Sequence, residues 1–293
     1  MQRFPLGQFT VYRIGFGAMQ LPGPGVFGPP RDHDQAIAVL RRAVELGVDH
    51  IDTAQFYGPD VANQLIREAL APYPDNLALV SKVGARRDDN GGWLPAHEPD
   101  ELRKGIEDNL KTLGVDQLAA VNLRVMDPEA EPNQPGQVNP ELFDRQLSAM
   151  IEARDEGLIA GIGLSNITLE HLQIALDRTH IACVQNAFNI VDRTSAPVLD
   201  ACAERGIAFV PFFPLGSGFA ADNPVLGNPV VQRTAERLSR TPAQIALAWT
   251  LAVSPNVLLI GGTSSVGHLE ENMAVADVEL DEDTVDELTS QTA

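Results

Sequence analysis

Cysteine is almost absent from the sequence, since Cys183 and Cys202 are the only two. Two cysteines are too few for a disulfide framework and lack the paired spacing of a zinc site. Both lie in apolar segments, which indicates buried free thiols. Long apolar runs are also missing: no stretch approaches the ~18 residues of a membrane span, and the N-terminus has no signal-peptide pattern. We therefore expect a cytoplasmic protein without disulfides.

Basic residues are outnumbered by acidic ones. The 21 Lys and Arg residues against 40 Asp and Glu residues give a formal net charge of -19. This charge opposes binding to polyanions, so we expect neither nucleic acid nor an anionic membrane surface as a partner. The acidic residues are spread along the chain, which is typical of a solvated surface. The oligomeric state stays open between a monomer and a weak homo-oligomer.

What the sequence does contain is a regular alternation of short β-rich segments with longer segments of helical period. No shift in composition suggests a linker, so we predict one domain over residues 1–293. Eight segments have the composition of strands, and they are RIGFGAM, HIDT, LALVSK, AAVNLRVM, IAGIGLS, ACVQNAF, IAFVPF and NVLLIGG. Eight βα units predict an α/β fold, the (β/α)8 TIM barrel, with a C-terminal helical appendage and a short N-terminal hairpin. A doubly wound sheet is the alternative.

Several helices between these strands have clear boundaries. Apolar residues recur at helical spacing, and a capping residue or a glycine marks an end. Asp32 or Asp34 is available to cap the first of them. The predicted helices are residues 34–46, 100–113 and 141–156, and one that begins at Thr241 and Pro242.

Three residues with complementary chemistry fall at neighbouring strand ends. Asp52 ends the second predicted strand, Tyr57 follows in its loop, and Lys82 ends the third. In a barrel of this kind, chemistry occurs at the C-terminal ends of the strands. A tyrosine is a poor acid at neutral pH unless a nearby cation favours its ionised form, and a lysine held by an aspartate supplies that cation. Taken singly, each residue has an ordinary structural explanation as a cap or a packed aromatic.

Four segments in this order resemble the aldo-keto reductase family. They are HIDTAQFYG, SKVG, GIGLSN and IGGTSSVGHLEEN, and VQNAFN and PFFPLGSG add two further family-like segments. The resemblance runs from about Arg13 to Asn272. It implies NAD(P)H-dependent reduction of an aldehyde or ketone, which fits the absence of a GxGxxG fingerprint. Tyr57 would be the general acid, Lys82 would tune it, and Asp52 would hold Lys82.

The sequence departs from the family at one catalytic position. Where the family has a histidine, the strand AAVNLRVM places Arg124, and the alternation of apolar residues turns Asn122 and Arg124 toward the barrel interior. An arginine can polarise a carbonyl or hold an anion, but it cannot shuttle a proton. Alternatively, Arg124 pairs with a neighbouring acid such as Asp52 and never meets substrate.

The NLR pattern also bears on the substrate. A branch of bacterial members that resembles this chain has the same pattern, and some of that branch reduce pyridoxal to pyridoxine. The resemblance therefore implies pyridoxal or a related aromatic aldehyde as the small-molecule carbonyl substrate. The predicted substrate contacts are Met19, Phe56, Trp93 and Asn122, together with the irregular loop 126–140. For Trp93, a role as a loop anchor on the barrel rim is the alternative.

The resemblance also implies a set of cofactor contacts. By position, Ser165, Asn166 and Gln185 match the nicotinamide carboxamide site, and Phe212 matches the residue that stacks on the nicotinamide ring. The remaining matches are Leu215, Gly216 and Ser217 at the pyrophosphate, and Gly262, Thr263, Ser264, His268, Glu271 and Asn272 at the adenosine end. The basic residue usual near the 2'-phosphate is missing. We expect NADP(H), with NAD(H) not excluded.

Two other functional classes were weighed. A regulatory or redox-sensing subunit would bind NADPH with little turnover, and a large exposed apolar patch would favour it. A metal-dependent hydrolase needs converging histidines and carboxylates. No histidine falls at the C-terminal end of a predicted strand, and no HxH or HExxH occurs, so we expect no metal site.

Overall fold

The computed structural model describes residues 2–127, 130, 134–216 and 223–291. Within these ranges, eight strands form one sheet in the order β11-β10-β9-β8-β5-β4-β3-β12, with parallel pairing. Seven of them lie inside the predicted segments, and β5 extends one residue beyond LALVSK, to Val83. Their bounds are Ile14–Gly17 (β3), His50–Asp52 (β4), Ala78–Val83 (β5), Ala120–Arg124 (β8), Ile162–Ser165 (β9), Cys183–Gln185 (β10), Ala208–Phe209 (β11) and Leu259–Ile260 (β12).

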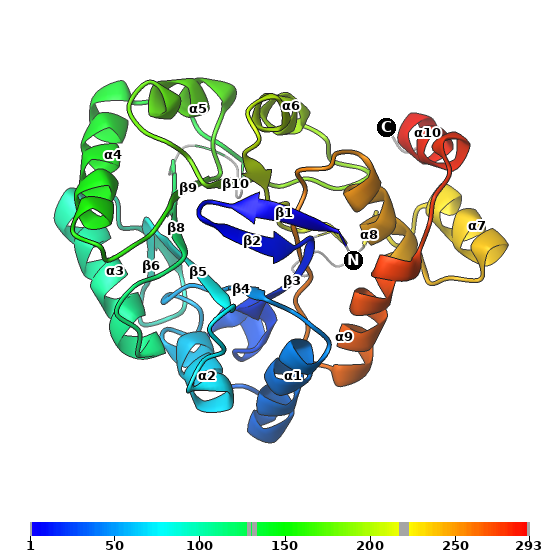
Figure 1. Cartoon of the computed structure of the whole chain (residues 1–293), viewed down its shortest axis with the longest axis horizontal. Helices are drawn as coiled ribbons and strands as arrows, with labels where there is room; N and C mark the ends of the chain where they lie inside the picture. Colours follow the sequence, from blue (N-terminus) through cyan, green and yellow to red (C-terminus); the bar gives the residue numbers. More distant parts are fainter. Residues whose placement is uncertain (1, 128–129, 131–133, 217–222, 292–293) are drawn as a thin grey trace.

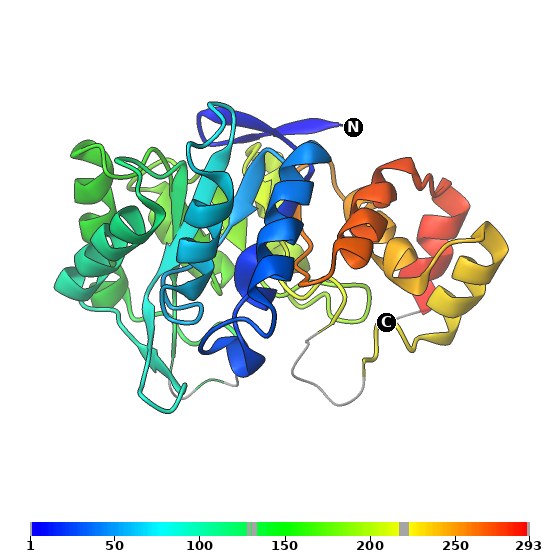
Figure 2. The ribbon, with the colours of Figure 1, turned by 90° about the horizontal axis from the view of Figure 1, so that it is seen from below.

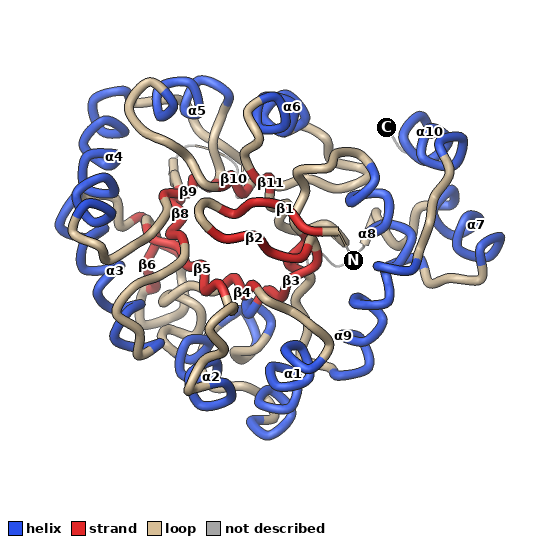
Figure 3. Tube along the Cα trace, viewed as in Figure 1, coloured by secondary structure: helices blue, strands red, loops and turns tan. Residues whose placement is uncertain are grey.

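The sheet closes on itself. A parallel bridge joins Phe209, at the end of β11, to Val257, and the backbone amide of Leu258 donates to Phe209 O at 2.9 Å. Figure 3 shows the strands as a ring inside a ring of helices. The prediction of a (β/α)8 barrel is therefore confirmed, and the doubly wound alternative, which leaves two open sheet edges, is wrong.

Eight helices alternate with the barrel strands, and the boundaries predicted for four of them agree with the structure to within one residue. Asp32, rather than Asp34, caps the first helix, since its side chain accepts from Gln35 N at 2.9 Å. Thr241 caps another by accepting from Gln244 N at 3.2 Å. The bounds are His33–Glu45 (α1), Val61–Leu70 (α2), Pro99–Leu113 (α3), Pro140–Asp155 (α4), Leu169–Leu176 (α5), Ala196–Glu204 (α6), Pro242–Ala252 (α8) and Val266–Met273 (α9).

Two further helices lie at one side of the barrel. The C-terminal helix α10 (Glu282–Gln291) is the predicted appendage, and it packs against α7 (Pro229–Leu238), which the sequence reading did not predict. Figures 1 and 2 show this pair in yellow and red. Short 3-10 turns are Ala18–Gln20 (η1), Pro24–Val26 (η2) and Ala274–Asp277 (η3). In the described part of the chain, every helix falls short of the length and apolar character that a membrane span requires.

The predicted N-terminal hairpin closes the bottom of the barrel. Strands β1 (Arg3–Leu6) and β2 (Phe9–Tyr12) pair antiparallel and lie across the ring in Figure 1. Leu6 and Val11 are buried in one cluster with small residues of the barrel interior, including Ala78. With this end closed, only the opposite face, where the strands have their C-terminal ends, offers access to the interior.

A second hairpin rises from the loop after β5. Strands β6 (Ala85–Arg87) and β7 (Trp93–Pro95) pair antiparallel, with Arg87 opposite Trp93. Asp88 shapes the turn, because its Oδ1 accepts from Asn90 N at 2.8 Å and from Gly92 N at 2.7 Å. This hairpin stands at the same end of the barrel as the C-terminal ends of the strands.

Candidate active site

Polar side chains converge at the C-terminal ends of five neighbouring strands. Asp52, Arg124, Ser165 and Gln185 are the last residues of β4, β8, β9 and β10, and Lys82 is the last but one of β5. Since parallel strands of a barrel end on one face, residues far apart in sequence are brought together here. The predicted location of the chemistry is thus where the structure gathers these side chains.

Asp52, Tyr57 and Lys82 form a buried group. The Lys82 ammonium donates to Asp52 Oδ1 and, at 3.1 Å, to Thr53 O, and it lies 5.0 Å from the centre of the Tyr57 ring. Tyr57 is 5% exposed, and the other two are equally buried. Burial lowers the pKa of Lys82, but the Asp52 carboxylate and Tyr57 outweigh this and raise it above its ordinary value. Lys82 therefore stays a cation at neutral pH beside the phenol.

The second oxygen of Asp52 is held by Gln185. Gln185 Nε2 donates to Asp52 Oδ2 at 2.6 Å. A carboxylate only accepts hydrogen bonds, so this contact fixes the orientation of the amide and turns Gln185 Oε1 away from Asp52. That oxygen is buried and has no hydrogen-bond partner within the described ranges.

Asn166 presents a second amide oxygen of the same kind. Its Nδ2 donates to Val125 O at 3.0 Å and to Gln134 O at 3.1 Å. Backbone carbonyls accept only, so Asn166 Oδ1 must face the other way, where it is buried and without a partner among the described residues. Its backbone has a φ of 60°, which an asparagine tolerates better than most residues. Two orphaned amide oxygens fit the NH2 group of a carboxamide, and so the residues present fit a nicotinamide cofactor.

Arg124 lies beside this group. Its Nη1 is 3.5 Å from Ser165 Oγ, and its guanidinium carbon is 5.6 Å from the centre of the Phe212 ring. Burial lowers the pKa of Arg124, and the nearby Tyr57 opposes that effect. The guanidinium keeps its charge near neutral pH. A cation therefore stands at the end of β8, beside Ser165 and Phe212.

Asn122 and Phe56, two of the predicted substrate contacts, are both buried, and Asn122 has polar partners inside the barrel. The Nδ2 of Asn122 lies 3.4 Å from Ser81 O, and its Oδ1 accepts from the Cys183 thiol at 3.4 Å. Asn122 has no exposed surface and lies opposite Lys82 on the neighbouring strand. This position favours a role in holding the strands together over contact with substrate. Both predicted free thiols are confirmed as buried, and burial raises the pKa of Cys202 to about 12.

Three aromatic rings pack together beside this group. Phe56 meets Tyr57 edge to face at 5.4 Å between ring centres and meets Trp93 in the same way at 5.5 Å. Trp93 is 38% exposed, and among the described residues it is the large hydrophobic side chain that is classed as exposed. Met19, on η1, is partly buried. Trp93 is therefore partly exposed and also packed against Phe56, and its contact with substrate stays a prediction.

The predicted adenosine-end residues surround the start of α9. Gly262, Thr263 and Ser264 link β12 to this helix, and Ser265 caps it by accepting from His268 N at 3.4 Å. A Cβ on Gly262 would lie 2.6 Å from Gly17 O, so only glycine fits there. His268 and Glu271 are exposed on α9, and Asn272 is buried.

The pyrophosphate matches lie in the loop after β11. Asn223 Nδ2 donates to Leu215 O at 2.7 Å, and Gly216 has a φ of 84°, a left-handed conformation that favours glycine. Ser217 lies outside the described residues, as do residues 128–129 and 131–133 of the predicted substrate loop.

A buried polar network that sequence reasoning missed supports Asp52 and Lys82 from behind. Ser81 Oγ donates to Asn109 Oδ1 at 2.5 Å, Asn63 Nδ2 donates to the same oxygen at 2.9 Å, and Thr53 Oγ1 donates to Asn63 Oδ1 at 2.8 Å. The network joins β4 and β5 to α2 and α3, and so sets the spacing between Asp52 and Lys82. A signal was present in the sequence, since Asn109 interrupts the apolar stripe of α3.

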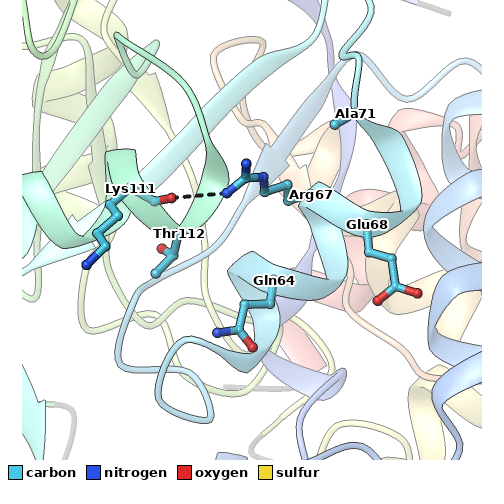
Figure 4. Close-up of a pocket in the computed structure, with 6 residues that line it drawn as sticks. All are labelled: Gln64, Arg67, Glu68, Ala71, Lys111 and Thr112. Atoms are coloured by element: carbon cyan, nitrogen blue, oxygen red, sulfur yellow. Dashed lines mark hydrogen bonds between the residues drawn. The ribbon is translucent and has the colours of Figure 1, made fainter.

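A pocket on the outer surface is unrelated to this group. It lies between α2 and α3, and Figure 4 shows Arg67 reaching Lys111 O at 3.5 Å across it. Its lining residues are Gln64, Arg67, Glu68, Ala71, Lys111 and Thr112. Among the residues that the structure describes, no group of three or more His, Cys, Asp and Glu side chains could hold a metal ion.

Comparison with known proteins agrees with this architecture. The sequence profile of the Aldo/keto reductase family matches residues 13–292. The chain is 50% identical over 285 residues to pyridoxine 4-dehydrogenase of Escherichia coli, covering 97% of this chain and 96% of that protein. It is 38% identical over 275 residues to an uncharacterized oxidoreductase of Schizosaccharomyces pombe, covering 94% and 85% of the two chains.

A solved structure of similar shape is a thermostable aldo-keto reductase in complex with the inhibitor epalrestat. It has a TM-score of 0.81 and 27% identity, and the match covers 99% of this chain and all of that chain (100%). An NADP complex of an aldo/keto reductase from Klebsiella pneumoniae, with a TM-score of 0.77 and 24% identity over 97% and 92% of the chains, shares the fold. With its closed barrel, its group of Asp52, Tyr57 and Lys82 at the strand ends, and a family match over nearly all its length, the chain belongs to the aldo/keto reductase family and is an oxidoreductase.

Proposed function

We propose that the protein reduces an aldehyde or ketone to an alcohol with NADP(H), and that Tyr57 is the general acid. The observation that carries this is the buried Lys82–Asp52 ion pair beside the Tyr57 ring. When bound, the reduced nicotinamide supplies the hydride to the carbonyl carbon. Tyr57 then gives its proton to the carbonyl oxygen, and Lys82 stabilises the phenolate that remains. General acid catalysis of this kind typically contributes ~10² to 10⁴ in rate.

The chain's own amides would hold the cofactor. Gln185 Oε1 and Asn166 Oδ1 would accept from the carboxamide NH2, which is the donor that both buried oxygens need. Phe212 would stack on the ring, and the N-terminus of α9 would meet the adenosine phosphate. Because His268 stands where a basic residue is usual, NAD(H) remains an alternative to be tested by titration.

We propose pyridoxal, or a related aromatic aldehyde, as the substrate. The relative that is 50% identical is named pyridoxine 4-dehydrogenase. Dehydrogenation of pyridoxine gives pyridoxal, and it is the reverse of the reduction proposed for this protein. Pyridoxal has an ionisable phenol next to its aldehyde. The Arg124 guanidinium, within the same group as Tyr57, would pair with that phenolate, since hydrogen bonds between ionised partners are the strong ones.

The regulatory alternative has less support. It calls for a large exposed apolar patch, whereas Trp93 is the large hydrophobic residue that the described surface exposes.

The general acid is tested by NADPH consumption with a panel of carbonyls that includes pyridoxal. We expect Tyr57→Phe to lower kcat by ~10² or more while NADPH binding is retained. The matched control is Tyr73→Phe, because Tyr73 is partly buried and donates to Leu113 O at 2.6 Å, away from the strand ends. Full activity in Tyr57→Phe would refute the mechanism.

The substrate is tested with Arg124→Met. We expect its kcat/KM to fall by about tenfold or more for pyridoxal relative to benzaldehyde, which lacks the phenol. An equal change for both aldehydes would remove Arg124 from substrate recognition. Pyridoxal that is never reduced, while benzaldehyde is, would remove the substrate proposal and leave the general acid intact.

A further inference from the structure

Arg87, on β6, connects the loops that follow two different barrel strands, β3 and β5. Its Nη1 donates to Val26 O at 2.8 Å, and its Nη2 donates to Gly25 O at 2.9 Å and to Gly91 O at 2.7 Å. Its Nε also donates to Gly91 O, at 3.1 Å. Val26 and Gly25 belong to η2, in the loop after β3, while Gly91 lies in the turn of the β6–β7 hairpin. One guanidinium thus joins this hairpin to the loop after β3.

The same guanidinium lies against aromatic rings. Its carbon is 4.1 Å from the centre of the Trp93 ring and 5.3 Å from that of Phe27. A cation over an aromatic face is attracted by the ring's quadrupole, and a planar guanidinium also stacks on it. Because Trp93 is partly exposed, this contact is a principal restraint on where its ring lies.

The loop held by Arg87 has a strained backbone. Val26 has a φ of 57°, although a β-branched side chain rarely adopts the left-handed region. Such a conformation persists only where the surroundings determine it, and it is found at functional sites. Here Val26 O accepts from Gly58 N at 3.1 Å as well as from Arg87, and Gly58 directly follows Tyr57. The strained loop is therefore fixed on one side to the hairpin and on the other to the general acid's own loop.

The rings form a continuous aromatic wall, defined as Tyr57, Phe56 and Trp93, from the catalytic group to the surface. Neighbouring rings in this wall meet edge to face at 5.4 and 5.5 Å. We propose that Arg87 is a positioning residue that holds Trp93 against Phe56, and that the wall selects planar aromatic aldehydes over small aliphatic carbonyls. This proposal rests on the carbonyl reduction proposed above, and it assigns the preference for aromatic substrates to a residue that does not touch them.

Arginine is suited to this place and lysine is not. The contacts of Arg87 require donors in several directions within one plane, and a planar surface for the Trp93 ring. A lysine ammonium is a compact point charge with three donors and no face to stack. Arg87→Lys therefore keeps the charge while losing the geometry, which makes it the informative substitution.

The neighbouring residue is a matched control. Arg86 lies on the opposite face of the same strand, its side chain is 55% exposed, and its Nε is 3.9 Å from Glu101. Arg86 and Arg87 share residue type, strand and charge. Arg86→Lys and Arg86→Met therefore report the effect of the substitution without loss of the hydrogen bonds and the Trp93 contact of Arg87.

The kinetic test compares KM for benzaldehyde with KM for propanal in the wild type, both Arg87 variants and both Arg86 variants. We expect Arg87→Lys and Arg87→Met to raise KM for benzaldehyde by about tenfold, the ratio that corresponds to one lost stacking contact, with kcat and the propanal KM changed little. The Arg86 variants should match the wild type. An unchanged KM ratio in both Arg87 variants would overturn the proposal, as would an equal loss for both substrates.

A second measurement needs no substrate. Of the two tryptophans, Trp249 is fully buried, so quenching of fluorescence by acrylamide reports mainly on Trp93. We expect a higher quenching constant in the Arg87 variants and the wild-type value in the Arg86 variants. If Tyr57→Phe keeps full activity, the proposed function fails, but the quenching measurement still tests whether Arg87 holds Trp93. If quenching is unchanged in Arg87→Lys, the proposed role of Arg87 is wrong, while the proposed carbonyl reduction is unaffected.

Discussion

Gln185 Nε2 donates a 2.6 Å hydrogen bond to Asp52 Oδ2, and Lys82 donates to the other oxygen of the same carboxylate. Strands β4, β5 and β10 therefore meet at one buried anion. Gln185 has its remaining oxygen turned toward the place where the cofactor's carboxamide is proposed to bind. A single side chain thus connects the cofactor site with the ion pair that tunes the general acid.

Substitution of Gln185 should affect both properties. In Gln185→Leu, Asp52 Oδ2 loses its donor while remaining buried, so we expect the free energy of unfolding to fall by about 1–3 kcal/mol. NADPH should also bind more weakly, by roughly tenfold, because an acceptor for its carboxamide is gone. Urea unfolding and a fluorescence titration with NADPH measure the two effects.

Gln146→Leu is the control for this change. Gln146 lies on α4 rather than on a barrel strand, is also buried, and donates one hydrogen bond, to His97 O at 3.1 Å. It should lose stability without any change in NADPH affinity. Wild-type affinity in Gln185→Leu would show that Gln185 does not contact the cofactor.

The network behind Lys82 should matter for rate as well as stability. In Asn109→Ala, the buried Ser81 hydroxyl and Asn63 amide lose a shared acceptor, so we expect a loss of about 1–3 kcal/mol in stability. Since β5 is then less firmly placed, kcat should fall by ~10-fold or more, because small misplacements of catalytic groups are costly. Urea unfolding and single-turnover reduction measure these effects.

Asn256→Ala separates the two consequences of that substitution. Asn256 is buried, donates to Ile207 O at 2.9 Å and accepts from Ser254 Oγ at 2.6 Å, at the opposite end of the barrel strands. It should lose similar stability and keep its kcat. Equal kcat in the two variants would show that the network only stabilises the fold.

His171 should make the fold sensitive to mild acid. Burial lowers its pKa from 6.5 to about 4, and its Nδ1 accepts from Thr168 N at 3.2 Å, so the neutral ring is the form that fits. Between pH 4 and 6.5 the unfolded chain binds a proton that the folded chain excludes. Stability is therefore full above pH 6.5 and falls as the pH drops toward 4, by up to about 3 kcal/mol from this residue.

Urea unfolding at pH 7 and pH 5 checks this expectation. His171→Asn should flatten the pH dependence, because asparagine does not titrate and can still accept from the backbone at the cap. His180→Asn, at an exposed histidine, should leave the wild-type pH dependence in place. A wild-type slope in His171→Asn would mean that other groups cause the loss in acid.

Several features of the fold and the site could be predicted because they depend on local pattern. Strand and helix periods are encoded within each segment, and caps such as Asp32 and Thr241 act within three residues. The meeting of Asp52 with Lys82 also followed, since eight βα units leave only one face where the ends of successive strands converge.

Other features could not be predicted, because each depends on partners that only the folded chain brings near. Arg87 reads in sequence as one basic residue of a polar loop, and its carbonyl partners at Gly25 and Val26 lie some sixty residues earlier. The alternation of apolar residues in its strand predicts that Asn122 faces the barrel interior. This alternation does not show whether a residue lies in the buried middle of the barrel, as Asn122 does, or at its open end.

By itself, the sequence determined the barrel, the order of its strands and the residue types at their C-terminal ends, because hydrophobic period and turn chemistry act over short distances. The tertiary structure decided which donor takes which oxygen of Asp52, which way the Gln185 and Asn166 amides face, and that Arg87 holds Trp93. Hydrogen bonds and ring contacts depend on distances of a few ångströms and on direction, and those are set only when distant segments pack together.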